Sequence, residues 1–351
     1  MKELRDFLRL GACTVLPLVL FALILARLHP QPADPEPEAP PPTAILRETD
    51  APEADASPEP EEPSLLSPDG ERRVKLITPE GVLELSMAEY LPGVVAAEMP
   101  AAFPAEALKA QAVAARTDTV WRQLGHSPHP DGACCSDPGC CKAWLSREEL
   151  KARWGEEYDH WAAAVREAVT ATDGQVLLYG GEPIFAAFHA CSPGSTEASE
   201  NVWMEALPYL RSVSSPETAD TVPNFTSAVT LSYLELRRTA AEKYPGLQLT
   251  GPGETWLTEA QYSESGRLLT VKLGDTALTG TQLRFLLGLR SAAVTWTCGE
   301  EEIRFQARGS GHGVGMSQYG ARQMALEGAD CWTILAHYYP GAIPGEMPAQ
   351  P

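Results

Sequence analysis

The sequence predicts an α+β fold, with mixed helices and antiparallel strands in a two-lobed domain over residues 72–345. Between residues 73 and 85, two runs of alternating apolar residues flank a Pro-Glu-Gly turn, which is typical of an antiparallel hairpin. Residues 145–172 carry large apolar side chains at helical spacing, namely Trp154, Tyr158, Trp161, Val165 and Val169. Strands and helices are interleaved without a repeating strand-helix-strand unit, which favours the α+β class.

The elements after the hairpin follow from local signals. Ser86 and Glu89 form a capping box, which predicts a helix start, and Pro92 with Gly93 is expected to split that helix before Glu98. Pro104 suits the first position of a helix reaching about residue 124. Further expected elements are a strand pair at 175–179 and 183–189, helices near 231–243 and 281–287, and strands near 267–273 and 302–307.

The N-terminus carries an apolar run expected to be a membrane anchor over residues 11–27. Lys2, Arg5 and Arg9 precede the run, which predicts that residues 1–10 lie in the cytoplasm and the rest of the chain outside. A cleaved signal peptide is the alternative. No small-x-small cleavage site follows the run, which favours an uncleaved, single-pass anchor in the cell membrane.

Residues 28–71 are rich in Pro, Glu, Ala and Asp and are expected to be an acidic, disordered tether. Between residues 30 and 71, twelve Asp or Glu stand against the single Arg47, a net charge of −11 out of −20 for the 351-residue chain. The remainder carries −9, so the acidity belongs largely to the tether. Nothing in this charge pattern suggests a nucleic-acid binder.

Glu98 is the leading candidate for acid-base chemistry because it closes an apolar helical stretch, LPGVVAAE. Burial disfavours the carboxylate and raises its pKa, so such a Glu can stay protonated near neutral pH and donate a proton. The alternative is a surface Glu at a helix end. Lys109 and Arg116 lie seven residues apart on one face of the next helix, which could point at the same cleft.

A cluster of His and Cys residues between positions 126 and 141 predicts a metal site. Four thiols and two imidazoles in sixteen residues can supply tetrahedral zinc ligands. Disulfides are the alternative, because an extracytoplasmic location permits them. Adjacent cysteines cannot readily bridge each other, however, and histidines have no role in a disulfide.

Two long segments, LPGVVAAEMPAAFPAEALKAQAVAARTDTV at 91–120 and GSGHGVGMSQYGARQMA at 309–325, together resemble the stage II sporulation protein D family. Further segments similar to the family lie at 189–203 and 208–213, and the resemblance runs from about residue 73 to 340. The family comprises membrane-anchored lytic transglycosylases that act on peptidoglycan during engulfment, and a related branch is named amidase enhancers. The resemblance implies that Glu98 alone cleaves the MurNAc-GlcNAc β-1,4 bond, leaving 1,6-anhydroMurNAc ends.

The resemblance also implies a ligand set, since some family members bind zinc through His-x5-Cys-x4-His-Cys. The matching residues are His129, Cys135, Cys140 and Cys141, so the third ligand is Cys instead of His. Cys134 is a possible competitor for Cys135. With four protein ligands the expected zinc is structural.

Other positions are expected to bind substrate. Arg116, Tyr209 and Arg211 match positions that the family associates with activity, and a Lys commonly stands where Arg211 does. The glycine-rich segment lacks the spacing of a dinucleotide loop, so its glycines are expected to let the backbone approach a sugar. It would present Ser310, His312, Gln318 and Tyr319 to that sugar; the alternative is a tight turn in which His312 is satisfied internally.

Two other functions stay open. One is a non-catalytic glycan-binding enhancer of a peptidoglycan amidase, which would not need Glu98. The other is a catalytic zinc site, which four tight ligands without an open position would exclude. The resemblance further implies glycan strands stripped of stem peptides as substrate, with a peptidoglycan amidase and a multi-pass membrane protein as partners.

Overall fold

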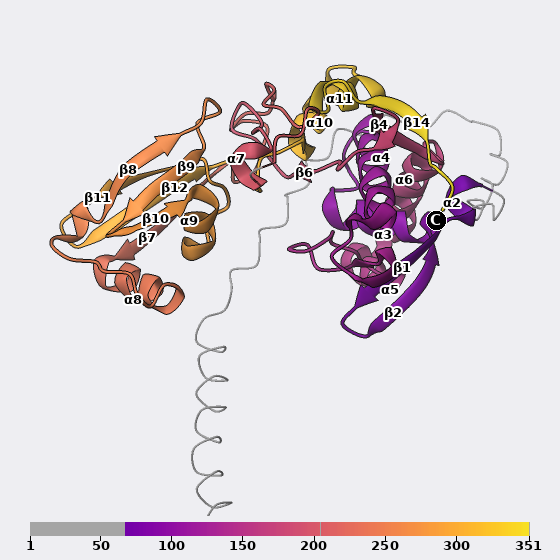
Figure 1. Ribbon diagram of the computed structural model, residues 1–351. Coiled ribbons are helices and arrows are strands. Elements are labelled where there is room, and N and C mark those ends of the chain that lie inside the picture. Colours follow the sequence, from indigo (N-terminus) through magenta and orange to yellow (C-terminus); the bar gives the residue numbers. More distant parts are fainter. Residues whose placement is uncertain (1–66, 204, 351) are drawn as a thin grey trace, which may run out of the picture. The chain divides into compact units, whose positions relative to one another are not determined.

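The computed structural model describes residues 67–203 and 205–350 (Figure 1). The expected cytoplasmic tail at 1–10, the anchor at 11–27 and all but the last residues of the tether lie outside this range. No helix within the described ranges has the length and apolar character needed to span a membrane. The α+β class is confirmed, since helices alternate with small sheets whose strands pair mainly in antiparallel fashion.

The fold begins five residues before the expected boundary at 72. A short helix, α2 (Pro68–Glu71), starts at Ser67, whose side-chain oxygen accepts a hydrogen bond from the N–H of Gly70 at 3.1 Å. Asp69 is buried in this helix. The last residues assigned to the tether are therefore part of the folded domain.

The predicted hairpin is confirmed as β1 (Arg73–Thr78) and β2 (Gly81–Ser86), with Arg73 opposite Ser86. A third strand, β3 (Cys134–Cys135), pairs in parallel with β1. This pairing attaches the cysteine-rich segment to the hairpin.

The capping box of Ser86 and Glu89 is confirmed at the start of α3 (Met87–Glu98), but the expected break at Pro92 is wrong, since the helix continues through it. Long-range packing explains the difference. A Cβ placed on Gly93 would lie 2.3 Å from Nε1 of Trp144, and that indole N–H donates to the carbonyl of Tyr90 at 3.2 Å. Contacts with a distant segment thus outweigh the local preference of proline.

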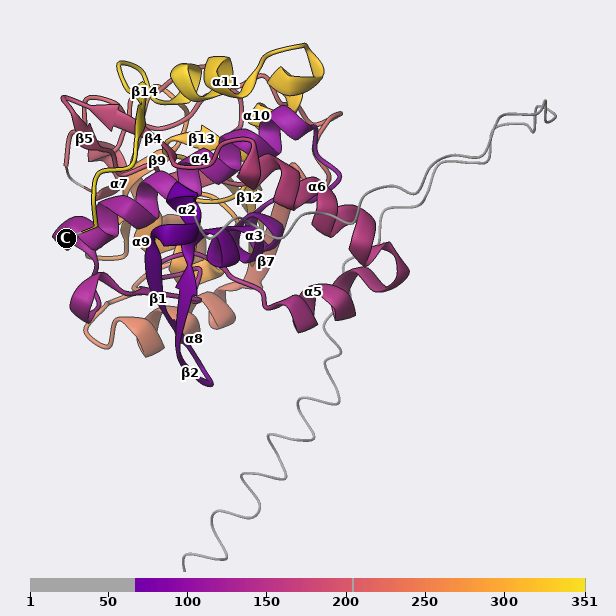
Figure 2. The same cartoon turned by 90° about the vertical axis from the view of Figure 1, so that its right-hand side faces the viewer.

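Helix α4 (Ala105–Trp121) is almost entirely buried from Ala107 to Val120 and forms the centre of the first hydrophobic core. Figures 1 and 2 show it among the elements that contact it, namely α3, α6 (Tyr158–Thr170), β4 (Gln175–Tyr179), α10 (Gln318–Leu326) and α11 (Cys331–Tyr338). The helical stripe at 145–172 is confirmed, although Gly155, with a φ of 54°, separates α5 (Arg147–Trp154) from α6.

A second hydrophobic core forms from residues between 226 and 308. One sheet has the order β11-β12-β7 and another β10-β9-β8, and α8 and α9 pack with them. The predicted helices and strands in this region are confirmed. The bounds are β7 (Thr226–Ser232), α8 (Tyr233–Lys243), β8 (Leu257–Tyr262), β9 (Leu268–Leu273), β10 (Thr276–Thr279), α9 (Gly280–Leu287), β11 (Val294–Cys298) and β12 (Glu302–Arg308).

The strand predicted at 183–189 is only partly formed as expected, because only its first residues pair with β4. Strand β5 (Glu182–Pro183) pairs with β4 as expected, and β14 (Ile343–Glu346) covers the other edge of β4. The residues that follow, β6 (Phe188–His189), pair instead in parallel with β13 (Met316–Ser317). This pairing brings the glycine-rich segment and the segment after residue 188 together.

Candidate active site and metal centre

Glu98 is the last residue of α3 and is half-buried. Its Oε1 accepts a hydrogen bond from the backbone N–H of Ala143 at 2.8 Å. Burial raises the pKa of Glu98, and the Ala143 N–H, the charge of Lys142 and the amide of Gln318 act in the opposite direction. The balance favours retention of the proton above the usual pH range of a glutamic acid.

Gln318, the first residue of α10, comes from the glycine-rich segment and is only 6% exposed. Its amide lies against the Glu98 carboxyl and also donates to Oε1 of the buried Gln111 at 3.4 Å. The two long segments that carry the family resemblance therefore meet at Glu98.

A buried ionic group lies beside Glu98 and was not found by sequence reasoning. Oδ2 of Asp118 accepts hydrogen bonds from Nζ of Lys142 and, at 2.9 Å, from Nε of Arg122. The side chains of Lys142 and Asp118 are each only 4% exposed. The i, i+4 spacing of Asp118 and Arg122 was a usable signal, but nothing local connects Lys142 to them.

The cations expected to share a cleft with Glu98 have other partners. Lys109 pairs with Glu106 at 2.8 Å, and Glu106 also accepts from the N–H of Cys331 at the start of α11. Nε and Nη2 of Arg116 donate to Asp69 at 2.8 and 2.6 Å, and none of the Arg116 side chain is exposed. The common helical face therefore does not bring Lys109, Arg116 and Glu98 together.

Tyr209 lines an aromatic cavity of about 540 Å³ with Trp121, Tyr179 and Glu182. The Tyr209 ring lies 5.4 Å from that of Tyr179, and the Trp121 ring is stacked on that of His126 at 4.3 Å between ring centres. Aromatic faces beside a carboxylate can bind the apolar face and the hydroxyls of a sugar. Glu98 is not among the side chains that line this cavity.

Arg211, the other cation expected from the family pattern, is exposed and pairs with Glu200 at 2.7 Å. Tyr209 lies in the same loop. Its ring is buried, whereas the Arg211 side chain faces solvent, so the two residues expected to act together lie in different environments.

The glycine-rich segment is a run of turns, since Gly309, Gly311, Gly313 and Gly315 all have positive φ. Nε2 of His312 donates to the carbonyl of Phe188 at 2.8 Å, and Nδ1 accepts from the N–H of Val314 at 3.1 Å. Burial lowers the pKa of His312 to about 4, so the ring is neutral near pH 7. Both ring nitrogens therefore have hydrogen-bond partners within the protein, as expected from the alternative of a tight turn.

The other polar residues of this segment also have internal partners. The backbone N–H and carbonyl of Ser310 pair with Cys191, and the Tyr319 ring packs edge-on against Phe103 at 5.1 Å. Ser317 donates to Glu217, a buried carboxylate that also accepts from Ser192 N–H at 2.6 Å. Sequence reasoning missed Glu217, because its partners other than Ser215 are distant in the chain and no motif marks such a carboxylate.

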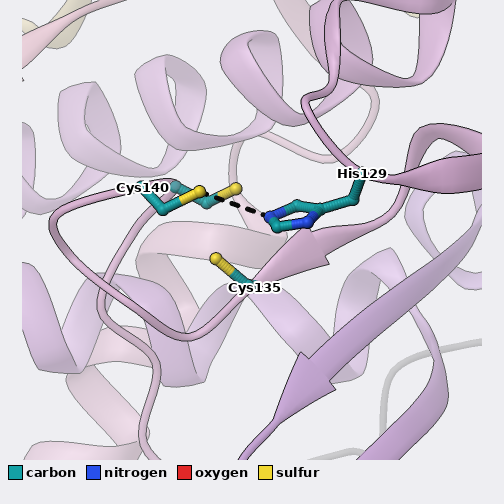
Figure 3. Close-up of side chains that lie close together, drawn as sticks. His129, Cys135 and Cys140 are labelled. Atoms are coloured by element: carbon teal, nitrogen blue, oxygen red, sulfur yellow. Dashed lines mark hydrogen bonds between the residues drawn. The ribbon is translucent and has the colours of Figure 1, made fainter.

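The four predicted metal ligands form one group. The ligand atoms of His129, Cys135, Cys140 and Cys141 all lie within 4.8 Å of one another, and Nε2 of His129 is 3.3 Å from Sγ of Cys140 (Figure 3). In a tetrahedral site with zinc-sulfur bonds of about 2.3 Å, neighbouring sulfurs are about 3.8 Å apart. The group therefore fits a zinc ion with small adjustments.

The cysteine thiols bear on the disulfide alternative and on the competing cysteine. All seven cysteines within the described ranges are free thiols. Cys134 is buried and is not one of the four mutually close ligands, although its thiol contacts Cys141. Hydrogen bonds from the Cys134 thiol and the Cys135 N–H, together with the charge of Arg122, lower the pKa of Cys141 to about 4. This favours the thiolate, the form that binds metal.

Comparison with known proteins identifies the family. Residues 79–179 match the family model described as Stage II sporulation protein, SpoIID. The chain is 37% identical to stage II sporulation protein D of Bacillus subtilis (strain 168) over 274 residues, which cover 77% of each chain. It is also 37% identical to the protein of the same name from Bacillus amyloliquefaciens, over 74% of each chain. The chain belongs to the stage II sporulation protein D family.

This membership confirms the family expected from the sequence and links the protein to sporulation. The residues matched by the family model include Glu98 and all four residues of the metal group, whereas the glycine-rich segment lies beyond them. A more distant relative is the amidase enhancer of Bacillus subtilis (strain 168), 29% identical over 72% of this chain but only 39% of its own length.

Proposed function

We propose that this member of the stage II sporulation protein D family is a lytic transglycosylase that cleaves the MurNAc-GlcNAc β-1,4 bond of peptidoglycan and leaves 1,6-anhydroMurNAc ends. The observation that carries the proposal is the setting of Glu98. Its carboxyl is half-buried, its pKa is raised by that burial, and a backbone N–H is fixed on Oε1. The acidic proton then belongs on Oε2, the oxygen that would face the glycosidic bond.

One carboxyl group is sufficient for this reaction. Glu98 gives its proton to the glycosidic oxygen as the bond from that oxygen to C1 of MurNAc breaks. The resulting carboxylate takes the proton of the 6-hydroxyl of the same sugar, and that oxygen forms the new bond to C1. The N–H of Ala143, the charge of Lys142 and the amide of Gln318 stabilise the carboxylate after the first transfer.

The aromatic cavity at Trp121, Tyr179 and Tyr209 would bind sugar rings of the same glycan strand. Because Glu98 does not line it, the rings held there lie away from the bond that is cleaved. Binding energy from such remote units can position the reacting sugar against Glu98.

Zinc fits the group of His129, Cys135, Cys140 and Cys141 by ligand type and spacing. A bound zinc would supply a fixed crosslink in the loop that carries these residues. Four protein ligands leave no open position for water or substrate, which argues against a catalytic zinc and for a structural one.

The relative named amidase enhancer supports a second candidate, a non-catalytic protein that binds glycan and stimulates a peptidoglycan amidase. The raised pKa and fixed carboxyl of Glu98 favour the enzyme, because an enhancer has no need of them.

In either case we propose a single-pass protein of the cell membrane that remodels septal peptidoglycan during engulfment. Stripped glycan strands, an amidase and a multi-pass membrane protein would be its substrate and partners.

Glu98→Gln in the full-length protein tests the assignment. Glutamine keeps the shape and can still accept the Ala143 N–H, but it cannot donate and recover a proton. The rate of anhydromuramyl product formation from stripped glycan, followed by mass spectrometry, should fall on the order of 10²- to 10⁴-fold. Glu98→Asp should also be slow, because the shorter side chain withdraws the proton from the glycosidic oxygen.

Glu106→Gln is the matched control, since glutamine can still accept the Cys331 N–H, and it should stay largely active. Near-normal cleavage by Glu98→Gln would overturn the assignment of Glu98 and favour the enhancer. Products with reducing ends would instead show a hydrolase.

A further inference from the structure

Among the residues that the structure describes, Arg267 has no hydrogen-bond partner for its buried guanidinium. It precedes β9 and is 2% exposed, and Nε, Nη1 and Nη2 of its guanidinium all lack a hydrogen-bond acceptor. Burial lowers the pKa of Arg267, but only to about 10, so it carries its charge at pH 7. A buried guanidinium usually has a carboxylate partner, because an unpaired buried charge costs several kcal/mol. An acceptor from outside the protein would remove that cost.

The carboxylate with the largest electrostatic effect on Arg267 already has other hydrogen-bond partners. Glu197 accepts hydrogen bonds at Oε1 from the N–H of Ala198 and the amide of Asn201, at 2.9 and 2.8 Å. At Oε2 it accepts from the hydroxyls of Ser263 and Ser265, at 2.5 and 2.7 Å. Glu197 therefore contributes charge to the surroundings of Arg267 but no hydrogen bond.

Arg267 lines a small cavity together with a second cation, Arg284, and with Glu197, Asn201, Thr281 and His312. His312 is neutral and both its nitrogens have partners, so the lining holds two cations against one carboxylate. The cavity measures about 10 Å³, close to the smallest space that holds one water-sized oxygen atom. A carboxylate can insert one oxygen there.

The glycine-rich segment is shaped around this guanidinium. Gly313 has a φ of 90°, which favours glycine, and a Cβ placed on it would lie 2.2 Å from Cζ of Arg267. The same segment continues to Gln318, whose amide contacts Glu98. The segment that contacts the proposed acid thus also packs on the unpartnered cation.

We propose that Arg267 and Arg284 form a binding site for a carboxylate of the ligand, and that this group is the free lactyl carboxylate of a muramic acid residue. The choice of muramic acid rests on the proposed function; the carboxylate class rests on the cavity and its charges. A guanidinium N–H can donate a charge-assisted hydrogen bond to the carboxylate oxygen that enters the cavity. A stem peptide converts the lactyl group into a neutral amide, so the site would distinguish stripped glycan from peptide-bearing glycan.

Binding to the full-length protein tests this proposal without any cleavage. N-acetylmuramic acid, its methyl ester, N-acetylglucosamine and sodium lactate are titrated by calorimetry against the wild type, Arg267→Met and Arg304→Met, an exposed control. We expect the free acid to bind on the order of tenfold to a hundredfold more tightly than its ester. Arg267→Met should abolish this preference, and Arg304→Met should retain it.

Equal binding of acid and ester by the wild type would overturn the proposal even if Arg267→Met failed to fold. A preference that survives in folded Arg267→Met would also overturn it. Lactate binding as tightly as N-acetylmuramic acid would support the carboxylate site but exclude the glycan as its ligand. Because no monosaccharide is cleaved, the result is independent of the Glu98→Gln experiment, and either proposal can fail alone.

Discussion

Removing the carboxylate of Asp69 should destabilise the protein strongly, because it leaves the charge of Arg116 buried without compensation. Asp69 accepts hydrogen bonds from Nε and Nη2 of Arg116 at 2.8 and 2.6 Å, and the two side chains are 3% and 0% exposed. The remaining partners of Arg116 are neutral, namely the Thr172 hydroxyl and the carbonyls of Val169 and Gln175. Breaking a buried pair of this kind typically costs about 3–5 kcal/mol.

Urea unfolding of full-length Asp69→Ala, followed by circular dichroism, measures this cost. The double variant Asp69→Leu/Arg116→Met is the control, because it removes both charges and should recover most of the lost stability. A loss below about 1 kcal/mol in Asp69→Ala, or a double variant as unstable as the sum of its single variants, would refute the reasoning. A stable double variant that has lost glycan cleavage would show that Arg116 also acts in the reaction.

Three further predictions follow from the same structure. A chain beginning at residue 72 should be less stable to urea than one beginning at residue 67, because it lacks the partner of Arg116. The protein should contain about one zinc per chain by elemental analysis; Cys140→Ser should lose it and melt at a lower temperature, whereas Cys191→Ser should keep it. Burial holds the pKa of His312 at about 4 in the folded protein, below its usual 6.5. Between pH 4 and pH 6.5 the folded state therefore binds fewer protons than the unfolded state. Acidification from pH 6.5 to 4 should therefore lower the unfolding free energy by up to about 1.4 kcal/mol per pH unit, and His312→Asn should flatten this slope in urea titrations.

The fold could be predicted where the signal is local. The capping box of Ser86 and Glu89 uses residues three positions apart, and the structure confirms it. The continuity of α3 at Pro92 depends on Trp144, which no local pattern connects to the helix. Asp69 was assigned to the tether by composition, because its partner Arg116 lies in a different element.

The residues of the candidate site show the same contrast between local sequence signals and long-range contacts. The four candidate metal ligands lie within thirteen residues of sequence, so the composition of one short segment predicted a metal site, and the family resemblance supplied the ligand set. Lys142 and Arg267 gave no signal, because burial of a cation depends on which distant elements cover it. Arg116 was assigned a role in activity from the family pattern, and its burial against Asp69 could not be foreseen from that pattern.

The environment of Glu98 has to satisfy two opposite requirements if one carboxyl performs both proton transfers. Before cleavage the proton must stay on the acid, which burial favours by raising the pKa; after cleavage the anion must be tolerated, which the Ala143 N–H, Lys142 and the Gln318 amide favour. Two of these three groups directly follow Cys141 in the chain. A metal centre that fixes Cys141 would therefore also fix the donors to Glu98, so its structural role and the chemistry at Glu98 are linked through two residues of backbone.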